Sequence, residues 1–207
     1  YSPLFFFFNS FGVATKISYH ILKDDAMRAN IIIHSITGNL LIIAKCFQEK
    51  LGEKGIDARI YRVEDTDLHV AAAESNEANE YYEDIISLPL ASNEKLRKGD
   101  VTILGCPTLF SLPTAEMKAF MDSAKSMLDT REMEGRLFYA FSASMYGKEA
   151  GESCATGLQL WADALGMNII DYPSYVHEED RDIPTRPGIG IDDVAKGLVE
   201  EIIKESK

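Results

Sequence analysis

The feature that most constrains this chain is a short apolar run that leads directly into a small, hydroxyl-rich turn. Ile31 to Ile33 is β-branched throughout, which is typical of a buried strand. The turn Ser35-Ile36-Thr37-Gly38-Asn39 follows it. Asn39 to Leu51 then repeats apolar side chains at helical spacing, and Gly52 ends the pattern. A strand that passes through such a turn into a helix is the repeating unit of α/β folds.

The turn itself predicts an anion site. Backbone N–H groups at the beginning of a helix carry partial positive charge and attract anions. The turn holds no lysine, and neither the P-loop spacing GxxxxGK[ST] nor the dinucleotide pattern GxGxxG is present. A lysine-free cradle of this kind suits a phosphate monoester such as that of FMN. The competing interpretation is an ordinary Ser/Thr-capped turn between a strand and a helix.

Further apolar runs alternate with helical patterns along the rest of the chain. We predict strands at 30–34, 56–63, 101–105, 137–141 and 167–170. We predict helices at 39–51, 114–127, 149–165 and 191–205. Strands that alternate with helices form parallel βαβ units, so the predicted fold is an α/β three-layer α/β/α sandwich with a five-stranded parallel sheet.

The predicted sheet locates a ligand site. In doubly wound sheets, ligands bind beyond the carboxyl ends of the strands, at the point where the strand order reverses. That rule selects the loops at 35–39, 105–113 and 142–151, which are also rich in Gly, Ser, Thr and Pro. We therefore expect these three loops to meet at one edge of the sheet.

Charge and cysteine usage exclude several classes of partner. The formal net charge of −12 argues against nucleic acid and against an anionic membrane, because either would repel the chain. The apolar run Leu4 to Phe8 is too short to span a bilayer. Cys46, Cys106 and Cys154 show no CxxC or zinc spacing, so we expect buried thiols in a reducing cytoplasm and no metal site. A redox role for Cys106 is the alternative.

Two stretches lie outside the clear α/β pattern. We interpret residues 1–26 as an N-terminal extension, such as a leader, and residues 27–207 as one domain beginning at Met27. The alternative is that the extension forms a peripheral strand or helix that caps the fold. Residues 64–99 are weakly patterned and hold no Lys or Arg before Lys95. We expect a solvated acidic helix or loop there, with a docking face for a basic redox partner as the alternative.

Three segments on the predicted loops carry recognisable motifs. Residues 35–39 read S-I-T-G-N, and residues 105–110 with 117–122 read G-C-P-T-L-F and M-K-A-F-M-D. Residues 142–147, with 151–153, form the third segment. Together they resemble the flavodoxin-like superfamily, most closely WrbA-type NAD(P)H:quinone oxidoreductases and related FMN reductases. The resemblance implies the flavodoxin-like strand order 2-1-3-4-5 and FMN as the cofactor.

The resemblance also implies which residues hold FMN. Backbone N–H groups at 37–40 and the hydroxyls of Ser35 and Thr37 would bind the phosphate. Phe110 would stack on a ring face or close its edge, although a core aromatic is the alternative. The full implied set is Ser35, Ile36, Thr37, Gly38, Asn39, Leu40, Pro107, Thr108, Leu109, Phe110, Ser142, Ala143, Ser144, Tyr146, Gly147 and Gly151. Leu40 departs from electron-carrier flavodoxins, which usually place a Thr there.

The implied function is an FMN-dependent oxidoreductase that transfers electrons from NAD(P)H to a quinone or similar acceptor, with assembly into a homo-oligomer. The alternative is a flavodoxin-type electron-transfer protein that docks to a partner reductase, which the acidic charge favours. A third interpretation is a binding or scaffold protein that has lost FMN. The cofactor carries this chemistry, so we predict no catalytic residue. We expect a structural role for His34, which ends the first strand.

Overall fold

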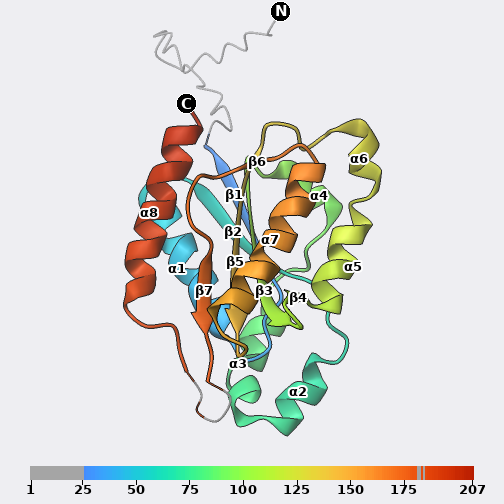
Figure 1. Ribbon diagram of the computed structural model, residues 1–207, viewed down its shortest axis with the longest axis vertical. Coiled ribbons are helices and arrows are strands. Elements are labelled where there is room, and N and C mark those ends of the chain that lie inside the picture. The colour runs from blue at the N-terminus through green and yellow to red at the C-terminus, as the bar shows by residue number, and fades with distance from the viewer. Residues whose placement is uncertain (1–25, 181–182, 184) are drawn as a thin grey trace, which may run out of the picture.

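The computed structural model describes residues 26–180, 183 and 185–207, so the predicted extension lies outside the described residues except for Ala26. A central sheet is covered by helices on both faces (Figure 1). The strands are β1 Arg28–Ile33, β2 Asp57–Arg62, β3 Val101–Leu109, β4 Leu112–Pro113, β5 Leu137–Ser144, β6 Asn168–Ile169 and β7 Tyr175–Glu178. The helices are α1 Asn39–Glu53, α2 Leu68–Glu74, α3 Asn76–Ser87, α4 Asn93–Lys98, α5 Ala115–Ser123, α6 Ser126–Thr130, α7 Lys148–Ala164 and α8 Gly190–Glu205.

The strand order confirms the predicted topology. The main path of the sheet runs β2-β1-β3-β5-β6, and all of these neighbours pair in parallel. Counted along the chain, these five strands have the order 2-1-3-4-5. Adjacent residues of β1 point to opposite faces, as the period of a strand requires. Ile31 and Ile33 join the core under α1 and α8, whereas Ile32 joins the core under α5 and α7.

Two strands were not predicted. β4 pairs antiparallel with the end of β3, and β7 pairs in parallel with the second half of β5. β6 and β7 thus share one edge of β5, and the chain between them contains Pro173, which has no N–H for a sheet ladder. The Tyr139 hydroxyl bridges this break, because it donates to the Pro173 carbonyl at 2.9 Å and accepts from the Tyr175 N–H at 2.9 Å.

Several predicted boundaries are wrong. The third predicted strand, 101–105, continues to Leu109, and the fourth, 137–141, continues to Ser144, so part of each predicted loop is strand. The predicted helix 114–127 is divided into α5 and α6, and α1 runs past Gly52 to Glu53. Residues 64–99 form three short helices, and the hydroxyls of Ser75 and Ser92 cap α3 and α4.

Within the described part of the chain, no helix combines the length and the apolar character needed to cross a bilayer.

Candidate functional site

The three predicted loops meet at one edge of the sheet. They follow β1, β3 and β5, which are neighbours in the sheet, and α3 lies near the same end of the molecule (Figure 1). The His34 N–H donates to the Gly105 carbonyl at 3.0 Å, which holds the ends of β1 and β3 together. Pro107 pairs with Ala143 where β3 and β5 end. Parallel pairing therefore places all three loops beyond the carboxyl ends of adjacent strands.

The first loop presents an open helix N-terminus. Gly38 is the N-cap residue of α1, with φ of 91°, and no side chain caps the helix. The first turn of α1 holds no acidic residue, and Asn39 and Leu40 are buried there. The N–H groups at the beginning of an α-helix have no partner within the helix. This turn therefore offers several backbone donors to an anion.

Ser35 tests whether the loop fits a phosphate. Its side chain is buried, with 3% of the residue exposed, and its Oγ atom has no hydrogen-bond partner among the described residues. A buried polar group without a partner costs free energy unless a ligand or water satisfies it. A phosphate at the N-terminus of α1 would supply such a partner, so the residues present fit this group.

Tyr81 of α3 covers the same loop. A Cβ atom built on Gly38 would lie 2.2 Å from Tyr81 Cγ and 2.4 Å from Cδ2. Position 38 thus requires glycine both for its backbone conformation and for its space. The weakly patterned acidic stretch of the sequence therefore contributes one wall of the candidate site.

The second loop forms a tight hairpin. Thr108 pairs with Pro113 and Leu109 with Leu112, so Phe110 and Ser111 are the two residues of the turn. Both have positive φ, 51° and 61°, as a type I′ turn requires. Phe110 is 81% exposed, so its alternative interpretation as a core aromatic is wrong. The hairpin thus exposes the Phe110 ring near the carboxyl ends of the strands. Its two positive φ angles cost backbone strain, which is typical of functional sites.

The third loop offers fewer side-chain groups than its sequence suggests. The Ser142 hydroxyl is fully buried and donates to the Gly151 carbonyl at 2.9 Å. The Ser144 hydroxyl accepts from the Tyr146 N–H at 3.1 Å. Gly151 lies under β7, because a Cβ there would approach Val176 Cγ1 to 2.3 Å. At its surface this loop presents the half-exposed side chains of Met145 and Tyr146, and the backbone at Gly147, the N-cap residue of α7, which no side chain caps.

A buried polar network lies beneath the loops, and sequence reasoning missed it. His34 Nδ1 lies 2.8 Å from Thr114 Oγ1, and His34 Nε2 lies 3.0 Å from Asp65 Oδ2. Thr114 also caps α5 by accepting from the Met117 N–H. The hydrogen bond from His34 holds the pKa of Asp65 below its ordinary value. The network ties the ends of β1, β2 and β4 together, which supports the structural role expected for His34.

A second missed group reaches the first loop from the C-terminal part of the chain. Asn39 Nδ2 donates to Glu179 Oε1 at 2.6 Å, and Arg186 Nη1 donates to the Thr37 carbonyl at 2.6 Å. These partners lie 140 and 149 residues away from the loop in sequence. No local motif marks them, so only the fold reveals the contacts.

The cysteines differ in how deeply they are buried. Cys106 and Cys154 are buried and Cys46 is partly buried, and all three are free thiols. Burial raises the pKa of Cys106 well above the ordinary value of a thiol. Across the described ranges, no group of three or more His, Cys, Asp or Glu side chains is arranged to hold a metal ion.

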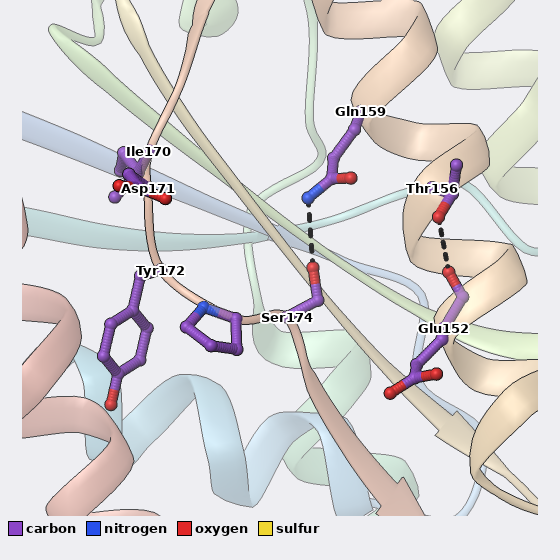
Figure 2. A pocket seen from close by; sticks show the side chains of 8 residues that line it. Glu152, Thr156, Gln159, Ile170, Asp171, Tyr172 and Ser174 are labelled. Atoms are coloured by element: carbon purple, nitrogen blue, oxygen red, sulfur yellow. Dashed lines mark hydrogen bonds between the residues drawn. The ribbon is translucent and has the colours of Figure 1, made fainter.

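A cavity of about 530 Å³ lies elsewhere, between α7 and the chain that links β6 to β7 (Figure 2). None of the predicted site residues lines it. Three polar side chains on its wall are hydrogen-bonded, since Gln159 Nε2 donates to Ser174 Oγ at 3.2 Å and Thr156 Oγ1 donates to the Glu152 carbonyl at 2.9 Å. The cavity is therefore separate from the loops that the sequence identified.

The fold and its three loops define the class of flavodoxin-like α/β proteins. Within this class, the chain belongs to the NADPH-dependent FMN reductase family, whose sequence model matches residues 27–181. This membership confirms the resemblance found in the sequence.

Individual relatives agree with this assignment. An NAD(P)H dehydrogenase (quinone) from Archaeoglobus fulgidus is 31% identical over 70% of this chain and 76% of its own length. A protein of the same name from Cupriavidus metallidurans is 28% identical over 72% and 71%, respectively. The flavodoxin, WrbA-like protein from Agrobacterium tumefaciens matches the fold with a TM-score of 0.63 at 14% identity, over 87% of this chain and 98% of that one. Oxidised flavodoxin 2 from Bacillus cereus gives 0.59 at 15% identity, over 86% and 99%.

Proposed function

We propose that the protein is an FMN-dependent oxidoreductase that transfers electrons from NAD(P)H to a quinone or similar acceptor. The observation that carries this proposal is the buried, unpartnered Ser35 hydroxyl beside the uncapped N-terminus of α1. Family membership and the names of the two quinone dehydrogenase relatives support the same chemistry.

Each loop has a distinct part in holding the cofactor. The backbone N–H groups of 37–40 and the Ser35 and Thr37 hydroxyls would bind the phosphate. Residues 107–110 would line the flavin ring, with Phe110 against its face or edge. The backbone at 144–147 would meet the polar edge of the ring, because the Ser142 hydroxyl is already engaged by Gly151.

Bound FMN would supply the hydride and electron chemistry. The residues of the chain would orient the ring and limit the access of water to it. Exposed apolar side chains lie on the hairpin after β3, namely Leu109, Phe110 and Leu112. The acidic surroundings would also disfavour an anionic reduced flavin and so lower its potential.

One experiment separates the enzyme from an electron carrier. The FMN-loaded protein is mixed anaerobically with NADH or NADPH alone, and flavin absorbance is followed by stopped flow. Rapid bleaching supports the enzyme, whereas reduction that waits for a partner reductase supports the carrier, which the acidic stretch 64–84 favours. A protein that cannot be reconstituted with FMN contradicts both.

Assembly and location belong to the same proposal. We propose a homo-oligomer, because the resemblance to WrbA-type enzymes implies one, and its mass in solution tests this directly. A reducing, cytoplasmic environment is supported by the three free cysteines.

A further inference from the structure

Two residues that follow β7, Glu179 and Arg186, contact the first loop and the beginning of α1. Arg186 Nη1 donates to the Thr37 carbonyl at 2.6 Å and to Asn39 Oδ1 at 3.0 Å. The amide of the same Asn39 donates to Glu179 Oε1. Arg186 therefore holds the turn before α1 at Thr37, and both Arg186 and Glu179 hold Asn39, the first residue of α1.

The guanidinium of Arg186 is fixed from the other side by α3. Its Nη1 lies 3.3 Å from Glu77 Oε1, and its Nη2 donates to Glu80 Oε2 at 2.8 Å. Its carbon centre lies 4.6 Å from the ring centroid of Tyr81, a cation–π distance. The Arg186 side chain is 29% exposed. Such a set of partners holds the group in one orientation.

The charges at this point conflict with an anion site unless Arg186 offsets them. Glu77, Glu80 and Glu179 bring three carboxylates to a loop that is suited to a phosphate. Like charges repel one another, more strongly where water is partly excluded. The loop contains no lysine or arginine of its own. Arg186 therefore offsets part of the negative charge that these carboxylates bring to the loop.

Arg186 also sets the direction of a backbone donor. In a trans peptide, the carbonyl of Thr37 and the N–H of Gly38 point in opposite directions, and the described chain contains no cis peptide. Because Arg186 binds the carbonyl, the Gly38 N–H is directed away from Arg186. It is thereby kept free for an anion rather than turned toward the carboxylates of α3.

We infer that Arg186 is a positioning residue for a phosphate monoester in loop 35–40, so that the protein binds phosphorylated flavin in preference to riboflavin. The inference rests on the proposed function for the identity of the ligand. It assigns the discrimination to a residue 147 positions beyond Asn39, outside the three flavin loops.

The test compares FMN with riboflavin, which lacks the phosphate, by fluorescence titration of the apoprotein. Arg186→Gln should weaken FMN binding about tenfold or more, because the charged donor that orients the Thr37 carbonyl and Asn39 is lost, and should change riboflavin binding by less than about twofold. Arg186→Lys keeps the charge without the planar fork and should give an intermediate FMN affinity. Arg59→Gln is the matched control, since Arg59 pairs with Asp57 in β2 and should leave both affinities unchanged.

A second measurement does not depend on flavin. Low concentrations of inorganic phosphate should raise the thermal midpoint of the wild type and of Arg59→Gln, but not that of Arg186→Gln. Equal losses for FMN and riboflavin, or equal phosphate shifts in all variants, would overturn the inference. A wild type that binds neither flavin would overturn the proposed function instead, and the phosphate shifts would still decide the role of Arg186. If Arg186→Gln does not fold, Arg186→Lys decides in the same assays.

Discussion

Gly38→Ala tests whether Tyr81 of α3 packs against loop 35–40 as closely as the structure describes. The substitution places a Cβ 2.2 Å from Tyr81 Cγ at a residue with φ of 91°. The left-handed conformation costs alanine about 1–2 kcal/mol, and overpacking adds about 1–3 kcal/mol. We therefore expect the free energy of unfolding to fall by about 2–5 kcal/mol, and FMN affinity to fall with it because the loop is displaced.

Gly55→Ala is the control that separates the two costs. Gly55 also has positive φ, 76°, but a Cβ there would meet nothing within 4 Å. This variant should lose only about 1–2 kcal/mol, and the smaller unfolded-state entropy of alanine offsets both variants equally. The difference between the two variants thus measures the clash with Tyr81.

A double-mutant cycle completes this test. Tyr81→Ala removes the ring, so the double variant with Gly38→Ala should recover about 1–3 kcal/mol relative to the sum of the single losses. Urea unfolding of the apoprotein, followed by circular dichroism, gives all four free energies. If Gly38→Ala matches Gly55→Ala, or if the cycle shows no coupling, the reasoning about Tyr81 is wrong.

Three further predictions concern the same edge of the sheet. Ser35→Ala should raise the free energy of unfolding of the apoprotein by up to about 1 kcal/mol, because it removes an unpartnered buried hydroxyl, and should weaken FMN binding about tenfold. A loss of apoprotein stability would show that the hydroxyl already has a partner. Asp65→Asn should lower the free energy of unfolding at neutral pH, because His34 lowers the pKa of Asp65 and so stabilises the folded state while the carboxylate is charged. The difference in free energy of unfolding from wild type should shrink as pH falls below about 4, where the carboxylate becomes protonated. A difference that urea unfolding finds constant with pH would refute this. Phe110→Ala should change the free energy of unfolding by less than about 0.5 kcal/mol while it weakens FMN, because the ring is exposed; a large loss of stability would mean that the ring packs in the core.

The parts of the fold that sequence predicts well are those coded by neighbouring residues. Ile31 to Ile33 is short, β-branched and bounded by a turn, and α1 follows with one apolar stripe. Both were therefore predicted to within a few residues. β4 and β7 have two and four residues and form only because β3 and β5 provide edges for pairing. β6 is as short as β4 but lies within the mostly apolar run 167–170, whereas β4 and β7 have no such run to mark them.

The candidate site likewise has parts that the sequence predicts and parts that only the structure shows. Loop 35–39 is predicted as an anion site because Ser35, Thr37 and Gly38 lie within four residues of one another and their chemistry is local. The hydroxyl of Ser142 was expected to face the cofactor, but its engagement by Gly151 depends on how α7 packs against β5. The sequence does not predict the contacts of Arg186 with Thr37 and Asn39, because they depend on how the fold brings residue 186 to the first loop. Long-range contacts of this kind leave no signature in a single sequence.

The acidic residues of 64–84 support one interpretation from the sequence and another from the structure. Read as a sequence, it is a run of unpaired carboxylates suited to a basic partner. In the structure, Asp65 binds His34, Glu77 and Glu80 bind Arg186, and Asp84 binds Lys45 at 2.8 Å. A carboxylate already paired within its own chain contributes little to steering a partner, because its field is largely cancelled at a distance. Glu77 and Glu80 are engaged by Arg186 beside loop 35–40, and Asp84 is engaged by Lys45, so these three carboxylates contribute little to the argument for an electron carrier.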